Sequence, residues 1–318
     1  MRIAVTGPIV IDNLMTFPGR FTSQLLPAQL QHLSLSFLVD DLEVRYGGVA
    51  ANVAYGLGRL GRRPLLLGAA GRDFGDYRAR LEEVGVDTSR VRVSAGLATA
   101  RYTRTTDADD NRIVSYHPGA LTEDDAPGPE GWPEDVGLVF LGPAEPEVLA
   151  ARAAECRRRG LPYLVDVAGR TRELGRSGAE AVLAGAAYLV TNRRERATLM
   201  EHTGWSAADV LGRVGAWITT LGPEGVWIDY AAQPSVAVPA APISRLPDGA
   251  GGGGAFRAGF LAAKADGRDD EDAARIGCVL AAYALESAGS QDYLFTPAAF
   301  EARLTDVYAP LAEAPLIA

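Results

Sequence analysis

The stretch at residues 248 to 260 reads Asp248-Gly249-Ala250-Gly251-Gly252-Gly253-Gly254-Ala255-Phe256-Arg257-Ala258-Gly259-Phe260, a glycine run that opens into a helical pattern. Glycine adopts positive φ readily, so successive backbone N–H groups can point into one concavity. The helix that follows adds the positive end of its dipole. The sequence therefore predicts an anion hole over Gly251, Gly252, Gly253 and Gly254, suited to a phosphate group.

Composition indicates one large globular unit. The chain has 318 residues, of which 47% are hydrophobic and 22% charged, enough for a single core spanning 1–318. A net charge of −9 without a basic run argues against a nucleic-acid partner. The two cysteines, Cys156 and Cys278, fit a reducing compartment, and no apolar run reaches about 18 residues. We therefore expect a cytoplasmic protein with no membrane partner.

The pattern of short apolar runs predicts a doubly wound α/β fold, with a mainly parallel sheet and helices on both faces. The expected strands cover residues 3–5, 65–67, 138–141, 163–165, 188–190 and 217–220, with helical periods between them, as at 148–159 and 179–184. Two stretches break this rhythm, about 9–46 and 98–118, and predict a small antiparallel β lid built discontinuously from both. The proline-rich and acidic segment 124–134 predicts a surface loop.

Polar groups follow the first strand at a point suited to sugar hydroxyls. Asp12 can accept hydrogen bonds from two vicinal hydroxyls, as in a ribose, although a strand-end Asp also caps turns. The pair Gly47-Gly48 opens a helix of small residues that carries Asn52, so a ligand can approach the backbone closely. A glycine pair of this kind also serves tight packing.

Two further short motifs follow later strands. Asn192 and Glu195 come directly after the strand at 188–190, where they fit either a phosphate site or a helix N-cap. Thr220-Leu221-Gly222-Pro223-Glu224-Gly225 follows the strand at 217–220, where it fits either a nucleotide loop or a β-hairpin turn. Each motif is weak alone, but the order of all four along the chain is informative.

Together the four motifs resemble the PfkB (ribokinase-like) family of sugar and nucleoside kinases. The C-terminal family signature, D-x-T-G-x-G-D-x-F-x-x-G, aligns with Asp248, Gly251, Gly253 and Phe256. The resemblance implies a ribokinase-like fold, with ATP or ADP and Mg2+ as cofactors. It also implies that Asp12, Gly48 and Asn52 hold sugar hydroxyls. The nucleotide and its phosphates would be bound by Asn192, Glu195, Thr220, Gly222 and Gly225, with Glu195 acting on Mg2+ through water.

A narrower resemblance, to actinobacterial adenosine kinases, runs nearly end to end. It includes the segments around Phe17 and Phe37 and the segment 255–260. This resemblance implies transfer of the γ-phosphoryl group of ATP to the 5'-hydroxyl of a purine nucleoside, contacts from Phe37 and Tyr102 to the substrate, and a homodimer.

The chain departs from this family at the reaction centre. The catalytic Asp of the signature falls on Gly254, which can stabilise a phosphoryl group but cannot take a proton. Cationic groups stand at Arg104, His117 and Arg170, so we expect altered chemistry on a nucleoside 5'-phosphate, such as dephosphorylation. A slow nucleoside 5'-kinase and a noncatalytic binding protein are the alternatives. The arginines and His117 can also lie in the lid or loops without a role.

Overall fold

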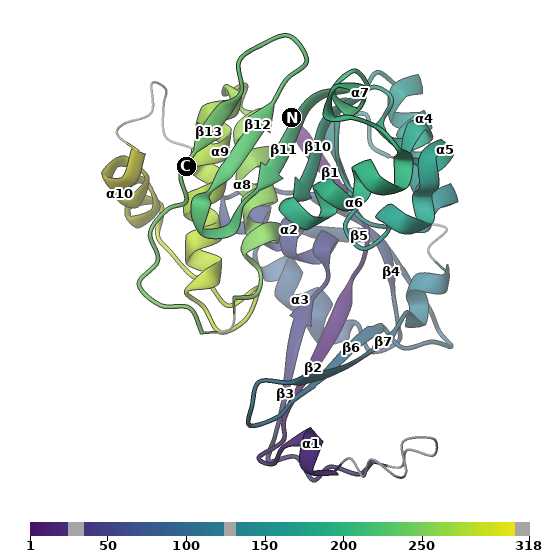
Figure 1. Ribbon diagram of the computed structural model, residues 1–318, viewed down its shortest axis with the longest axis vertical. Helices are drawn as coiled ribbons and strands as arrows, with labels where there is room; N and C mark the ends of the chain where they lie inside the picture. The colour runs from purple at the N-terminus through teal and green to yellow at the C-terminus, as the bar shows by residue number, and fades with distance from the viewer. Residues whose placement is uncertain (25–34, 124–131, 248, 309–318) are drawn as a thin grey trace.

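The computed structural model describes residues 1–24, 35–123, 132–247 and 249–308 (Figure 1). A large sheet of nine strands runs through the described residues in the order β13-β12-β11-β10-β9-β8-β1-β4-β5. Its strands are β1 (Arg2–Thr6), β4 (Leu65–Ala70), β5 (Asp87–Val93), β8 (Val136–Leu141), β9 (Tyr163–Asp166), β10 (Ala186–Asn192), β11 (Val214–Thr220), β12 (Val226–Asp229) and β13 (Val236–Val238). Seven neighbouring strands of this sheet are parallel, namely β11, β10, β9, β8, β1, β4 and β5, and β12 and β13 add an antiparallel edge.

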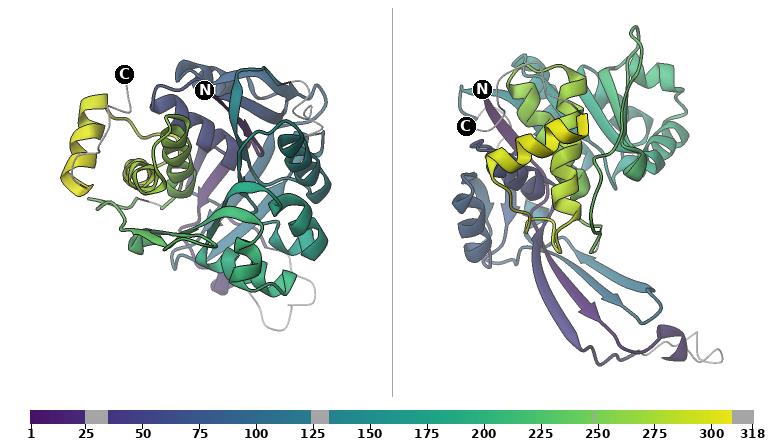
Figure 2. Two further views of the ribbon diagram at one scale, coloured as in Figure 1. Left: turned by 90° about the horizontal axis from the view of Figure 1, so that it is seen from above. Right: turned by 90° about the vertical axis from the view of Figure 1, so that its left-hand side faces the viewer.

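Helices cover both faces of this sheet, which confirms the predicted doubly wound architecture (Figure 2). One face packs against α2 (Val49–Arg59), α3 (Gly75–Glu83), α8 (Gly252–Ala265), α9 (Asp270–Leu285) and α10 (Pro297–Tyr308). The other packs against α4 (Pro146–Arg158), α5 (Thr171–Leu183), α6 (Arg193–Thr203) and α7 (Ala207–Leu211). Alternate residues of β1 enter the two cores: Ile3 and Val5 join the first and Ala4 the second.

A second, small sheet projects away from this body, with the short helix α1 (Phe21–Gln24) near its tip (Figures 1 and 2). Its strands are β2 (Val10–Thr16), β3 (Asp41–Gly47), β6 (Ala100–Thr106) and β7 (Arg112–His117), in the order β3-β2-β6-β7. The outer pairs are antiparallel, whereas β2 and β6 run parallel. These strands lie in the two stretches expected to form the lid, except that β3 extends one residue further, to Gly47. Below, this sheet is called the lid sheet.

Asp248 and residues 124–131 of the expected loop at 124–134 lie outside the described residues. The described part of the chain contains no helix that is both long enough and apolar enough to cross a bilayer.

Candidate functional site

The glycine run forms the first turn of α8 at the edge of the large sheet. Gly251 is the N-cap residue, with φ 83° and ψ −21°, and no side chain caps this helix end. The first hydrogen bond back along the chain runs from the N–H of Ala255 to the carbonyl of Gly251. The N–H groups of Gly252, Gly253 and Gly254 therefore have no acceptor within the helix and are available to an anion.

Close packing explains why these positions are glycine. A Cβ built at Gly251 would lie 2.6 Å from Cα of Ser290, and one at Gly252 would lie 3.0 Å from the side chain of Leu285. At Gly254 a Cβ would lie 2.9 Å from Cβ of Asn52, which belongs to α2. The turn is thus enclosed by α2, by the end of α9 and by the segment that follows α9, which approach its backbone directly.

Asp12 and the glycine pair meet where the lid sheet joins the body. Gly48 is the N-cap of α2 with φ 95°, and a Cβ there would lie 2.5 Å from the carbonyl oxygen of Pro8. A Cβ at Gly47 would lie 2.6 Å from Oδ2 of Asp12, so the carboxylate rests against this backbone. Both glycine positions are required by close approach, and the predicted neighbours Asp12, Gly48 and Asn52 lie on adjoining elements.

Asn52 is held in one orientation by the C-terminal part of the chain. Its Oδ1 accepts hydrogen bonds from Nε2 of Gln291 at 2.8 Å and from the hydroxyl of Ser290 at 3.1 Å. Gln291 is only 1% exposed, and its Nε2 also donates to the hydroxyl of Tyr77 at 2.6 Å. Since the network assigns the amide oxygen to these donors, the Asn52 nitrogen remains as the donor for a ligand. Sequence reasoning gave Ser290 and Gln291 no role.

Asp12 has an unusual acidity. Burial raises the pKa of Asp12 to about 6, while the positive charges of Arg104 and Arg45 oppose this rise. At neutral pH the group is mainly ionised, in the form that accepts hydrogen bonds from hydroxyl groups.

A cavity of about 820 Å³ opens at Gly48, between the lid sheet and the carboxyl ends of the strands, and Asp12, Asn52 and the glycine turn are not among the residues that line it. Gly48, Tyr116 and Arg170 are among its lining residues. The guanidinium of Arg170 forms ion pairs with Glu145, at 2.8 Å, and with Glu173. Arg170 therefore faces the cavity, as expected for a site residue, but two carboxylates share its charge.

The register of the lid sheet separates the other predicted residues by face. Asp12 pairs with Tyr102 on the neighbouring strand, and Tyr102 pairs with Tyr116, so these three side chains share the face toward the cavity. Arg104 lies two residues after Tyr102 in β6 and is therefore on the same face. The Nε of Arg104 is buried, and the described residues provide no hydrogen-bond partner for it. His117 is exposed on the opposite face.

Phe37 lies near the tip of the lid sheet. Its ring centroid is 5.0 Å from that of Phe17 and 5.0 Å from that of Phe21. Phe17 follows directly after β2, whereas Asp12 lies near the start of that strand. The structure therefore places Phe37 in an aromatic cluster at the far end of the lid sheet from Asp12.

The two later motifs lie side by side at the edge of the large sheet, because Asn192 at the end of β10 is the register partner of Thr220 at the end of β11. Asn192 and Glu195 form a capping box at α6: the N–H of Glu195 donates to Oδ1 of Asn192 at 2.9 Å, and the N–H of Asn192 donates to Oε2 of Glu195 at 2.8 Å. Burial raises the pKa of Glu195. Gly222 and Gly225, with φ 61° and 96°, shape the hairpin between β11 and β12. The N-cap interpretation of the first motif and the hairpin interpretation of the second thus describe the geometry. Both motifs lie at the carboxyl ends of β10 and β11, on the edge of the sheet where ligands are expected.

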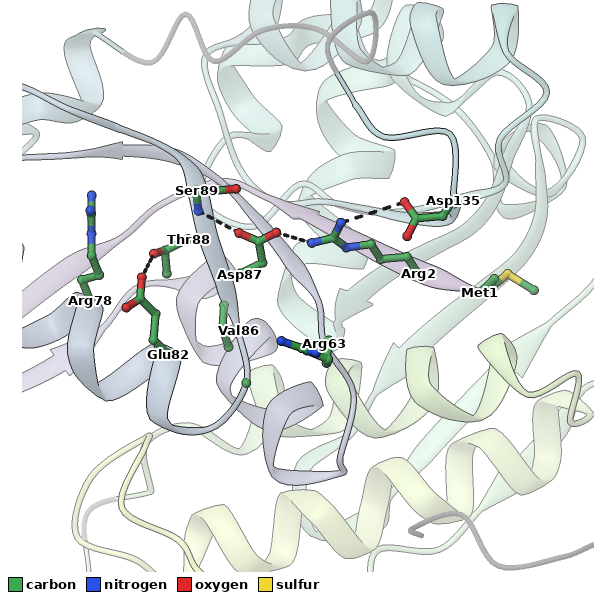
Figure 3. A pocket seen from close by; sticks show the side chains of 11 residues that line it. Met1, Arg2, Arg63, Arg78, Glu82, Val86, Asp87, Thr88, Ser89 and Asp135 are labelled. Atoms are coloured by element: carbon green, nitrogen blue, oxygen red, sulfur yellow. Dashed lines mark hydrogen bonds and ion pairs between the residues drawn. The ribbon is translucent and has the colours of Figure 1, made fainter.

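A cavity of about 830 Å³ lies at the opposite edge of the sheet, at the amino ends of the strands (Figure 3). Arg2 there pairs with Asp87 and Asp135, and Glu82 accepts a hydrogen bond from Thr88. The residues that the sequence predicts for the site are absent from its lining. The cavity of about 820 Å³, which Gly48 and Arg170 line, is therefore the better candidate site.

The donor set fits a nucleotide better than a protein-caged metal. The free N–H groups of the glycine turn suit phosphate oxygens. No group of three or more His, Cys, Asp or Glu side chains that could hold a metal occurs in the described ranges. Mg2+ often keeps several waters and binds with substrate phosphates, so a single carboxylate such as Glu195 suits it.

Comparison with known proteins agrees with this geometry. The model of the pfkB family carbohydrate kinases matches residues 9–297. A nucleoside kinase of Methanocaldococcus jannaschii is 26% identical over 300 residues, which cover 93% of this chain and 94% of the relative. The solved structure of Burkholderia thailandensis nucleoside kinase with inosine is 29% identical, with a TM-score of 0.85 over 96% of this chain and 98% of that one. The solved structure of the same kinase with ADP-inosine is 30% identical, with a TM-score of 0.82 over 99% of this chain and 98% of that one. The fold is therefore ribokinase-like, and the chain belongs to the pfkB family of carbohydrate kinases.

Proposed function

We propose that this chain is an ATP-dependent nucleoside kinase that phosphorylates the 5'-hydroxyl of a purine nucleoside. The observation that carries the proposal is the contact between Gly254 and Asn52, where a Cβ at position 254 would lie 2.9 Å from Cβ of Asn52. A phosphate hole and a sugar-hydroxyl site then adjoin at one helix contact. Phosphoryl transfer depends mainly on such positioning. The nucleoside kinases among the relatives support the same assignment.

In this proposal the carboxylate of Asp12 accepts hydrogen bonds from ribose hydroxyls, and the nitrogen of Asn52 donates to another sugar oxygen. The 5'-oxygen attacks the γ-phosphorus of ATP, the bond from that phosphorus to the β–γ bridging oxygen breaks, and ADP leaves. The N–H groups of Gly252, Gly253 and Gly254 stabilise the transferring group. Mg2+, held near Glu195 through water, would neutralise phosphate charge.

Position 254 gives this kinase an unusual proton path. The family resemblance implies an Asp there, and Gly254 has no side chain to accept the proton of the 5'-hydroxyl. We infer that this proton passes to phosphate oxygen or to water. Loss of a positioned general base slows such reactions by roughly 10²- to 10⁴-fold, so we expect slow transfer.

Two observations favour transfer over the removal of a 5'-phosphate. Arg170 is paired with Glu145 and Glu173, so its charge is not free for a substrate phosphate. His117 lies on the face of the lid sheet opposite Tyr116. Arg104 and Arg170 face the cavity but His117 does not, so the altered-chemistry hypothesis lacks its proton carrier at the site. The narrower assignments, a purine preference like that of actinobacterial adenosine kinases and a homodimer, stay predictions.

The proposal is tested by incubating the protein with ATP, Mg2+ and either adenosine or inosine, and by following nucleoside monophosphate and ADP by chromatography. A parallel incubation with AMP alone measures phosphate release. Formation of monophosphate and ADP in equal amounts, with a raised KM for the nucleoside in an Asp12→Asn variant, would support the kinase. If the nucleoside binds but no monophosphate forms, the proposal is wrong, and phosphate release from AMP would instead support dephosphorylation.

A further inference from the structure

A buried ion pair lies directly behind the glycine turn. Arg257, in the second turn of α8, is 7% exposed, and its Nε lies 2.8 Å from Oδ2 of Asp166. Asp166 is 1% exposed and ends β9. The Nη1 of Arg257 also donates to the carbonyl of Gly253 at 2.8 Å. One side chain thus connects the phosphate-binding turn to the edge of the large sheet.

This turn needs an anchor more than most helix ends do. Gly251 to Gly254 carry no side chains, and no side chain caps the helix. Glycine loses more conformational freedom on folding than other residues, so a run of glycines is poorly held by local preference. The guanidinium of Arg257 supplies a fixed contact within the run, at Gly253.

The same pair reaches toward the second phosphate motif. Asp166 and Glu195 lie at the carboxyl ends of neighbouring strands, because β9 pairs with β10 and Glu195 follows β10. Asp166 and Arg257 both act electrostatically on the carboxyl of Glu195, with opposite signs. The second oxygen of Asp166 accepts a hydrogen bond from the N–H of Ala168 at 2.9 Å, so the carboxylate is fixed from two sides.

We propose that Arg257 is a positioning residue for phosphoryl transfer: through Gly253 and Asp166 it fixes the glycine turn of α8 relative to the carboxyl ends of β9 and β10. The proposal rests on the proposed kinase function for its effect on rate. It assigns Arg257 no contact with substrate. Displacement of the turn by about 1 Å would lower kcat by about 10²-fold, because transfer depends on alignment of the reacting atoms.

The decisive variant removes both charges, Arg257→Met with Asp166→Asn, because removing Arg257 alone would leave a buried carboxylate without a partner. We expect kcat to fall about 10²-fold, while KM for the nucleoside, which binds at Asp12 and Asn52, stays unchanged. The matched control is Lys264→Met with Asp270→Asn. It removes another ion pair of α8, at 2.9 Å, near the opposite end of the helix, and should keep the parent kcat.

Hydrogen exchange of a peptide covering residues 249–260 provides a second readout that needs no activity. We expect faster exchange there in the Arg257 double variant and unchanged exchange elsewhere. Parent-like kcat in that variant, or faster exchange throughout the chain, would overturn the proposal. If the unmodified protein transfers no phosphate, the proposed function fails, and the exchange experiment alone decides whether Arg257 fixes the turn.

Discussion

Two substitutions of Gly254 separate the effect of a carboxylate at this position from that of packing. A Cβ at this position would lie 2.9 Å from Cβ of Asn52, about half an ångström closer than an ordinary contact, so α2 and α8 must move apart slightly. Overpacking of this kind costs about 1–3 kcal/mol. Replacing glycine in a helix returns up to about 1 kcal/mol. We therefore expect Gly254→Asp and Gly254→Asn to lose roughly 0–2 kcal/mol of unfolding free energy each.

The two variants share this packing change but differ in charge, so the ratio of their kcat values isolates the carboxylate. A positioned base contributes about 10²- to 10⁴-fold, equal to roughly 3–5 kcal/mol of activation free energy. We expect Gly254→Asp to exceed Gly254→Asn by at least about 10²-fold in ADP formation at saturating ATP and nucleoside. Urea unfolding of both variants checks that their stabilities match. Equal kcat values for the two variants would refute the inference that the absence of a carboxylate at position 254 slows phosphoryl transfer.

Three further predictions concern the nucleoside side of the site. Because the pKa of Asp12 is raised to about 6, its ionised form is lost as pH falls through that value, so KM for the nucleoside should rise below pH 6. The Asp12→Asn variant should show no such pH dependence of KM. A KM of the unmodified protein that stays constant down to pH 5 would contradict this prediction. Arg104 lowers the pKa of Asp12, so Arg104→Gln should move the same rise in KM to higher pH, and a shift to lower pH would count against it. Gln291→Leu removes a donor to Asn52 and should raise KM for the nucleoside about tenfold with kcat little changed, a loss of about 1–2 kcal/mol; steady-state kinetics with an unchanged KM would disprove the orienting role.

Local patterns in the sequence were sufficient to predict the frame of the molecule. Short apolar runs predicted strands β1, β4 and β8 to β11, which form the body of the large sheet. Glycine runs predicted the turn of α8 and the start of α2, because both need positive φ and close approach.

The contacts that orient the site could not be predicted in this way. Gln291 and Asn52 are 239 residues apart in sequence, and Arg257 meets Asp166 only because α8 packs beside the end of β9. Neither pair leaves a local pattern in the chain. The position of His117 could be resolved only by register, since a shift of one residue in β7 exchanges the two faces of the lid sheet.

The contact of α2 with α8 is repeated one turn further along both helices. A Cβ at Gly56 would lie 2.6 Å from Cβ of Ala258, so the two helices approach closely at Asn52 and again at Gly56. Under the proposed function, the acceptor and the donor of the phosphoryl group are then fixed by one rigid helix pair. During any movement of the lid sheet, whose strand β2 carries Asp12, Asn52 and the glycine turn would keep their relative positions.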